Sequence, residues 1–273
     1  MSLMFEMKIS QFLLTRFNSP VKYAPKDLGI NQAWLSHRFS LFENFCLPSV
    51  SSQDSKNFHW ILLIDERTPN QWVIRLNDGL AKLSSKNTIL PVAQFSEASI
   101  ISEIKKNVVD DKAFILSTRL DNDDAIADNF LSNILKVCQN LLPDQSYIIN
   151  FSNGCKVHTS GIYKHKPQAL NPFLSVFSSI QNLKTSLHKP HNKMDAAGTV
   201  IRIDGSKSSL NSIMWMQVIH NKNISNRLRK ESKLVAKGDI RRFSIAQNWR
   251  QLLKNISVSD HQTPQSSSLI LHL

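Results

Sequence analysis

The chain has 273 residues, of which 41% are hydrophobic and 20% charged, and its formal net charge at pH 7 is +12. This apolar content excludes a disordered protein, and the 7 Gly and 10 Pro exclude collagen-like and flexible-linker compositions. No apolar run approaches the ~20 residues of a membrane-spanning helix. Three widely spaced cysteines without a CxxC motif, and a start without a long apolar block, predict a soluble cytoplasmic protein without a signal peptide.

The first half of the chain alternates short apolar runs with longer amphipathic segments. We expect strands at 11–15, 59–64, 88–93, 113–117 and 146–151. We expect helices at 34–50, 69–83, 97–108 and 127–142. This alternation is typical of an α/β fold with a mostly parallel sheet and helices on both faces. Neither GxGxxG nor GxxxxGK follows the first expected strand, which argues against a dinucleotide fingerprint or a P-loop.

The spacing of apolar residues changes after about residue 153, in the second half of the chain. Residues 155–166 alternate like a hairpin, and 185–189 and 199–203 are further expected strands. We therefore expect mixed or antiparallel β structure, followed by a helix through the basic stretch.

The basic stretch, residues 222–254, contains ten Lys and Arg residues against two acidic ones. Such a concentration can meet the phosphates of nucleic acid or of anionic lipid head groups, or it can be a solvated surface without a partner. Its only aromatic residues are Phe243 and Trp249, which are too few for a stacking platform and argue against nucleic acid.

Three carboxylates, Asp121, Asp123 and Asp124, follow the fourth expected strand. Ligands bind beyond the carboxyl ends of strands in open α/β sheets. Alternate residues of an extended segment point the same way, so Asp121 and Asp123 are expected to converge, with Asp124 turned aside. Two oxygen ligands there suit Mg²⁺ or Mn²⁺, which take substrate phosphates as further ligands. One of the three could instead cap the following helix.

Six segments together resemble the family of bacterial rhamnosyltransferases, relatives of the inverting enzymes with the GT-A glycosyltransferase fold. These segments are FLLTRFN (12–18), RFSLFENFCLPSVSSQ (38–53), FHWILLIDERTP (58–69), TRLDNDDAI (118–126), NPFLSVF (171–177) and MWMQVIHNKNISNR (214–227). The resemblance spans roughly residues 10–230 and implies one continuous GT-A domain. Residues 1–153 would form the nucleotide-binding half, and 154–273 the acceptor-binding half with its basic helical tail.

The resemblance also implies roles for single residues. Nucleotide-binding residues would be Thr15, Arg16, Asp65, Arg119 and Asp121, with Asp65 at the base. Ligands of the Mn²⁺ or Mg²⁺ cofactor would be Asp121, Asp123 and His220. His188 and His191, which flank Pro190, are weaker candidates.

The implied reaction moves a sugar from a nucleotide-diphosphate donor to a saccharide or lipid-linked acceptor, with rhamnose suggested only by the name of the family. An inverting enzyme needs a carboxylate base for the acceptor hydroxyl. Asp195 and Asp204 are the only carboxylates between Asp144 and His220, and Asp204 is preferred because it ends an expected strand. The basic stretch could hold such an enzyme against the inner face of an anionic membrane, where cell-surface polysaccharide is assembled.

Two other functions compete with this interpretation. A phosphatase of the haloacid dehalogenase type also uses D-x-D, but on its first strand and with Thr or Val at the position of Ala125. A non-catalytic nucleic-acid-binding protein would explain the basic stretch, but it would leave three aspartates beside a polyanion unexplained.

Overall fold

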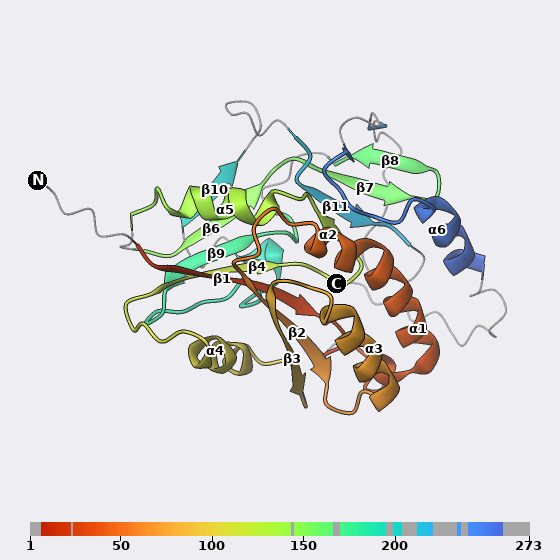
Figure 1. Cartoon of the computed structure of the whole chain (residues 1–273), viewed down its shortest axis with the longest axis horizontal. Coiled ribbons are helices and arrows are strands. Elements are labelled where there is room, and N and C mark those ends of the chain that lie inside the picture. Colours follow the sequence, from red (N-terminus) through yellow and green to blue (C-terminus); the bar gives the residue numbers. More distant parts are fainter. Residues whose placement is uncertain are drawn as a thin grey trace, which may run out of the picture.

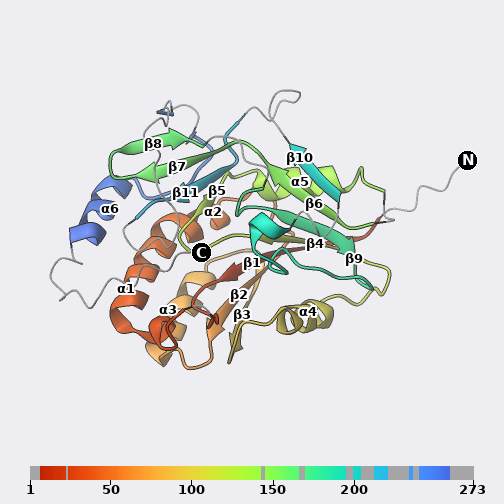
Figure 2. The same cartoon turned by 180° about the vertical axis from the view of Figure 1, so that it is seen from behind.

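The computed structural model describes residues 7–22, 24–142, 145–165, 170–194, 199–203, 212–220, 234–235 and 240–258. Within them a larger sheet and a smaller sheet lie next to each other, with helices packed around them (Figures 1 and 2). The expected GT-A-like α/β architecture is confirmed, because the larger sheet is mostly parallel, carries helices on both faces and is joined by a smaller mixed sheet.

The larger sheet has seven strands in the order β10–β6–β9–β4–β1–β2–β3. In chain order they are β1 (Ile9–Arg16), β2 (His59–Asp65), β3 (Lys86–Val92), β4 (Phe114–Arg119), β6 (Tyr147–Phe151), β9 (Ser175–Ser179) and β10 (Thr199–Ile203). β1 pairs in parallel with β2 and β4, β2 with β3, and β6 with β10. β9 is antiparallel to both of its neighbours, β4 and β6.

The smaller sheet has four strands in the order β5–β11–β7–β8. They are β5 (Ala125–Ile126), β7 (Gly154–His158), β8 (Gly161–Lys164) and β11 (Trp215–Val218). β7 and β8 form a hairpin, and β11 joins β7 in parallel and β5 in antiparallel orientation. Because β5 follows β4 almost directly, the Asp121–Asp124 segment connects the two sheets.

One long helical segment begins with α1 (Gln32–Leu41), continues through the π-helical turn η2 (Phe42–Cys46) and ends with α2 (Leu47–Ser51). It starts at Asn31, whose side chain accepts a hydrogen bond from Trp34 N at 3.0 Å. The other helices are α3 (Asn70–Leu80), α4 (Glu97–Lys106), α5 (Phe130–Cys138) and α6 (Trp249–Val258), with 3₁₀ turns η1 (Leu28–Ile30) and η3 (His191–Lys193).

The larger sheet buries both faces, because successive side chains of its strands alternate between them. Leu13 and Leu62 pack into the core that includes α1, α3 and α5. Leu14 and Leu63, one position further along, pack into a second core with Ile100 of α4. Strands buried on both faces read as continuous apolar runs, which is why β2 was recognisable from its sequence.

The expected secondary structure is mostly confirmed. All five strands and four helices of the first half are present, as are the hairpin and the strand at 199–203. The strand expected at 185–189 is wrong. There the polar side chain of Thr185 and the backbone N–H of Ser186 bond to Glu97 and Ser117, and the segment forms turns. The sequence prediction also missed β9. About half of the basic stretch, residues 222–233 and 236–239, lies outside the described residues, and in the described part only α6 is helical.

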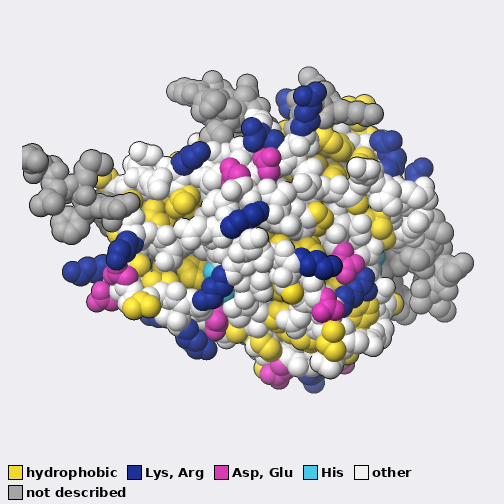
Figure 3. Space-filling view, viewed as in Figure 1, with side chains coloured by type: hydrophobic (Ala, Val, Ile, Leu, Met, Phe, Trp, Pro, Cys, Tyr) yellow, Lys and Arg dark blue, Asp and Glu magenta, His cyan; other side chains and the backbone are white. Residues whose placement is uncertain are grey.

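The described surface mixes charges of both signs. On the face seen in Figure 3, Lys and Arg side chains are spread widely and several lie next to Asp or Glu. Among the helices that the structure describes, none is long and apolar enough to cross a membrane.

Candidate functional site

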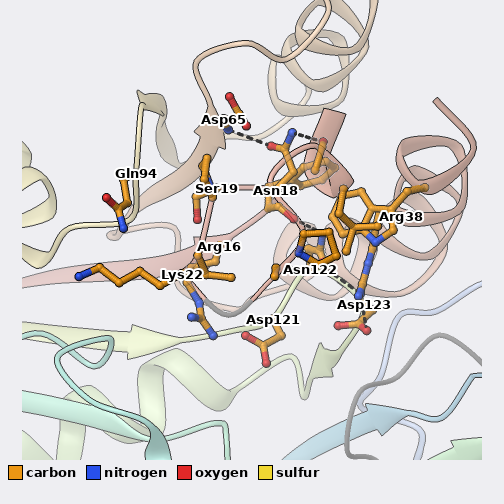
Figure 4. Close-up of a pocket in the computed structure, with 18 of the residues that line it drawn as sticks. Arg16, Asn18, Ser19, Lys22, Arg38, Asp65, Gln94, Asp121, Asn122 and Asp123 are labelled. Atoms are coloured by element: carbon orange, nitrogen blue, oxygen red, sulfur yellow. Dashed lines mark hydrogen bonds and ion pairs between the residues drawn. The ribbon is translucent and has the colours of Figure 1, made fainter. Parts of the chain in front are cut away.

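A cavity of about 840 Å³ lies beyond the carboxyl ends of the central parallel strands. Residues that follow β1, β2, β3 and β4 line it, because parallel neighbours end at the same edge of a sheet. Side chains of α1 and of η3 complete its wall, through Trp34, Arg38 and His191. In Figure 4 the labelled side chains come from α1 and from the residues at or after the ends of β1, β2, β3 and β4, and Arg38 reaches Asp123.

Asp121 and Arg119 form an ion pair at the end of β4. Arg119 Nη2 lies 3.0 Å from Asp121 Oδ2, and its Nε lies 3.2 Å from Oδ1. Burial would raise the pKa of Asp121, but the positive charges of Arg119 and Arg16 outweigh it, and the pKa lies below its usual value. Asp121 is 30% exposed, so an ionised carboxylate faces the cavity.

Asp123 lies two residues further on and is held by two other elements. Its Oδ2 accepts hydrogen bonds from Arg38 Nη1 at 2.7 Å and pairs with His220 Nε2 at 2.9 Å. Arg38 comes from α1, whereas His220 follows β11 of the smaller sheet. Burial acts to raise the pKa of Asp123, but Arg38 and the hydrogen bond with His220 hold it well below its usual value.

Asp124 serves the fold rather than the cavity. It is 2% exposed, and its Oδ1 accepts the backbone N–H of Val218 at 2.9 Å. Burial and the negative charges of Asp123 and Asp121 hold its pKa well above the usual value. The carboxyl thus ties the loop after β4 to β11. Residues 121–124 form a turn, with Asp124 N–H bonded to Asp121 O at 3.2 Å, and not the extended segment that the sequence predicts.

Asp65 borders the cavity at the end of β2, but its carboxylate is covered. Arg67 Nη2 lies 2.8 Å from Asp65 Oδ2, and Arg67 Nε lies 3.1 Å from Oδ1. Arg67 also reaches Asp27 at 2.7 Å, which ties the segment after β1 to the cavity wall. A ligand at this end of the cavity would meet Arg67 together with Asp65.

Other candidate residues lie in different places. Thr15 is fully buried and accepts a hydrogen bond from Trp60 Nε1 at 3.0 Å, so it belongs to the core and not to the cavity wall. His188 pairs with Glu97 at the start of α4, whereas His191 does line the cavity. The two candidate bases, Asp195 and Asp204, lie outside the described residues.

His220 lies behind the cavity and not on its wall. Its side chain is 0% exposed, its Nε2 meets Asp123, and its Nδ1 lies 3.3 Å from His37 Nε2. Sequence reasoning missed His37 and Arg38 as site residues. The only signal for them was that Arg38 opens one of the segments of family resemblance.

Comparison with known families decides which family this is. The family described as "Putative rhamnosyl transferase" matches residues 26–232. The chain belongs to this family. The match includes Arg38, Asp65, Asp121, Asp123 and His220, and it confirms the resemblance seen in the sequence.

Several solved structures are similar to this member of the rhamnosyl transferase family. TarS of S. aureus is 13% identical with a TM-score of 0.44, over 78% of this chain and 37% of that chain. A structure from Desulfovibrio desulfuricans G20, named as a putative nucleotide-diphospho-sugar transferase, is 10% identical with a TM-score of 0.38, over 72% of this chain and 80% of that one. The inositol-1-phosphate CTP transferase of T. maritima is 10% identical with a TM-score of 0.37, over 92% and 96%. No curated protein matches the chain.

The side chains at this site fit a divalent cation in their chemistry. Carboxylate oxygens suit Mg²⁺ and Mn²⁺, and imidazole is a common ligand of transition metals. Asp123 Oδ2 and His220 Nε2 lie 2.9 Å apart, and Asp121 borders the same cavity. Within the part of the chain that the structure describes, no three His, Cys, Asp or Glu side chains are already grouped to hold a metal. A cation would have to compete with Arg38 for Asp123.

Proposed function

We propose that this rhamnosyl transferase family member is a metal-dependent, inverting glycosyltransferase. It would move a sugar, rhamnose by the name of the family, from a nucleotide-diphosphate donor to a saccharide or lipid-linked acceptor. The observation that carries the proposal is the meeting of Asp121 and Asp123 with Arg16 and Arg119 in one cavity. Arginines bind phosphate oxygens and carboxylates bind a divalent cation, so together they suit a diphosphate with its metal ion.

The size and charge of the cavity support a nucleotide-diphosphate donor. Its volume of about 840 Å³ lies in the range of small-molecule and cofactor sites. The charged residues on its wall are Arg16, Lys22, Lys26, Arg38, Arg67 and Arg119, with Asp65, Glu66, Asp121 and Asp123. This excess of positive charge attracts an anionic ligand. In our proposal the diphosphate lies at Arg16 and Arg119, and the base lies toward Asp65 and Arg67.

The transfer would proceed by a single displacement. The acceptor oxygen forms a bond to the anomeric carbon, the bond from that carbon to the diphosphate breaks, and the hydroxyl proton passes to a carboxylate. Bound Mn²⁺ or Mg²⁺ would neutralise charge on the departing diphosphate, and Arg16 and Arg119 add fixed positive charge beside it. Asp204 or Asp195 remains our proposed base, from sequence alone.

We place the reaction in the cytoplasm, at the inner face of an anionic membrane. The described cations of the basic stretch, Arg241, Arg242, Arg250 and Lys254, are all exposed, although Arg242 pairs with Asp128 at 3.1 Å. Each Lys or Arg near such a surface contributes about 1 kcal/mol, and salt weakens the effect. Co-sedimentation with anionic vesicles should fall with salt and on reversal of Arg241 and Arg242. Equal pelleting with neutral vesicles would contradict membrane contact.

The donor proposal is tested by thermal stabilisation with nucleoside diphosphates, with and without Mn²⁺. We expect one of them to stabilise the wild-type protein in the presence of Mn²⁺, and Asp123→Asn to abolish the Mn²⁺-dependent part. Asp54→Asn is the matched control, because Asp54 is exposed and bonds Ser132 away from the cavity. Lack of stabilisation by any nucleoside diphosphate would overturn the function, whereas equal stabilisation without Mn²⁺ would overturn only its metal dependence.

A further inference from the structure

Helix α1 presents two consecutive side chains to the same carboxylate. Arg38 reaches Asp123 Oδ2 directly at 2.7 Å. His37 reaches it through His220, because His37 Nε2 lies 3.3 Å from His220 Nδ1 and His220 Nε2 lies 2.9 Å from Asp123 Oδ2. The hydrogen bonds from His37 through His220 to Asp123 thus connect helix α1 with the end of β11 and lead to the cavity.

The contacts of Asp123 set the directions of these hydrogen bonds, because its Oδ2 already accepts from Arg38 Nη1 at 2.7 Å. A carboxylate only accepts hydrogen bonds, so His220 Nε2 carries the proton toward it. In a neutral His220 ring Nδ1 is then an acceptor, and His37 Nε2 must donate to it. In a protonated ring Nδ1 donates and His37 Nε2 accepts. In both cases His37 saturates the second nitrogen of His220 and fixes the orientation of its ring.

Packing alone does not explain a histidine at position 37. Counted as whole residues with their backbone, both His37 and His220 are 7% exposed, and the other buried residues of α1 are Leu35, Phe39 and Leu41. An apolar side chain would fill the same space without the cost of removing a polar ring from water. A buried polar group therefore points to a hydrogen-bonding role, and one partner of His37 is His220, which meets the cavity carboxylate.

We propose that His37 is a positioning residue, which orients His220 and through it Asp123 toward the divalent cation and the donor diphosphate. The inference rests on the proposed function. Carboxylates that bind a metal are themselves commonly held by outer hydrogen bonds, as His220 holds Asp123, and loss of such outer partners typically lowers metal affinity 10- to 100-fold. His37 does not border the cavity, so it would act only through His220.

The test compares three variants of His37. His37→Phe keeps the ring volume without nitrogen, His37→Asn is too short to replace Nε2, and His37→Gln places an amide near the Nε2 position. His59→Gln is the control, because His59 is another buried histidine, bonded to Thr88 at 2.8 Å at the start of β2, the end opposite to the cavity. Free Mn²⁺ is measured by electron paramagnetic resonance during titration, in the presence of the nucleoside diphosphate that stabilises the wild type.

We expect His37→Phe and His37→Asn to weaken Mn²⁺ binding by about tenfold or more, with His37→Gln and His59→Gln close to wild type. The ¹⁵N resonances of the His220 ring, identified by their loss in His220→Ala, should shift in the Phe and Asn variants and stay in place in the Gln variant. These resonances report the hydrogen bond independently of metal.

Two results would overturn the proposal. One is a folded Phe or Asn variant that binds Mn²⁺ as tightly as wild type, and the other is a Gln variant as weak as the Phe variant. If His37→Phe does not fold, the Asn and Gln variants alone decide the matter. A wild-type protein that binds nucleotide but no Mn²⁺ would instead refute the metal dependence, and one that binds neither would refute the proposed function itself.

Discussion

Arg38 Nη1 lies 2.7 Å from Asp123 Oδ2, in a pair whose side chains are only 14% and 9% exposed. The guanidinium also lies 5.1 Å above the Trp34 ring, and its Nε is buried without a hydrogen-bond partner. Arg38 therefore neutralises Asp123 but is itself incompletely satisfied. An anionic ligand that offers an acceptor to Arg38, together with a cation that takes Asp123, would satisfy both residues.

This competition predicts an unusual response of Arg38→Met to metal. Removal of one partner from a buried pair leaves the other charge poorly compensated, so the free energy of unfolding should fall by about 3 kcal/mol in the absence of metal. Added Mn²⁺ should then stabilise the variant more than the wild type, because the cation no longer competes with Arg38. Urea unfolding with and without Mn²⁺ measures both effects.

The matched control for Arg38 is Arg242→Met. Arg242 pairs with Asp128 at 3.1 Å, but both side chains are exposed, at 51% and 37%. Its removal should change the free energy of unfolding by less than about 1 kcal/mol, with no response to Mn²⁺. Equal Mn²⁺ effects on Arg38→Met and the wild type would show that Arg38 and the cation do not share Asp123.

The pH dependence of stability should contain a contribution from His59. Burial, and next the charge of Lys86, lower the pKa of His59 to about 4. The folded state thus keeps the ring neutral, while the unfolded chain takes up a proton below pH ~6.5. The contribution of the neutral His59 ring to the free energy of unfolding is complete above pH ~6.5 and is lost as the pH falls toward 4.

Replacement of His59 by Gln removes this titration. Between pH 7 and pH 4 the free energy of unfolding of the wild type should fall by on the order of 1–2 kcal/mol more than that of His59→Gln. This value is smaller than the full pKa shift implies, because solvent partly screens the ring. Denaturant unfolding at several pH values measures the difference. Parallel pH profiles for the two proteins would contradict the assigned pKa shift.

The start of β7 should tolerate no side chain at Gly154. A Cβ there would lie 2.0 Å from the Trp215 ring. That ring stacks on Phe173 at 4.8 Å, and its Nε1 donates to Phe151 O at 2.8 Å, so it cannot move aside at low cost. Gly154→Ala should lower the free energy of unfolding by about 3 kcal/mol or more.

The comparison for Gly154 is Gly79→Ala in α3. A Cβ at Gly79 would meet only a Leu47 methyl group, at 3.2 Å, and alanine is a better helix former. We expect a change within about 1 kcal/mol, measured by thermal unfolding. A harmless Gly154→Ala would show that Trp215 is loosely held.

Arg67 should contribute to binding of the donor. It covers the carboxylate of Asp65 and borders the cavity, so Arg67→Met removes a charged hydrogen-bond donor where we place the base. Affinity for the stabilising nucleoside diphosphate, measured by calorimetry, should fall about tenfold or more. Arg75→Met is the control, since Arg75 pairs with Glu43 at 2.6 Å away from the cavity. Unchanged affinity in Arg67→Met would place the base elsewhere.

The sequence was informative where one short segment determines its own structure. β2 is an unbroken apolar run, and its seven residues are all buried. β9 was missed because only Val176 and Phe177 of its five residues are apolar, the rest being serines that suit a turn equally well. Its strand character comes from two neighbours, β4 and β6, that are distant in sequence.

Local sequence patterns could not predict which residues pair with Asp121 and Asp123. The sequence predicts that Asp121 and Asp123 face one way, yet Asp121 pairs two residues away and Asp123 pairs with α1 and with the end of β11. These contacts join positions 85 and 97 residues apart. Only the packed sheets bring such residues together, and no periodicity along the chain encodes them.

The place of β9 has a consequence for synthesis of the chain on the ribosome. β4 and β6 are translated first, but they are separated in the sheet by β9, which is hydrogen-bonded to both. Until residues 175–179 have emerged, one edge of β4 carries backbone groups without their final partners. A nascent chain that stalls between β6 and β9 therefore exposes an apolar strand edge, the kind of surface that recruits chaperones or pairs with another unfinished chain.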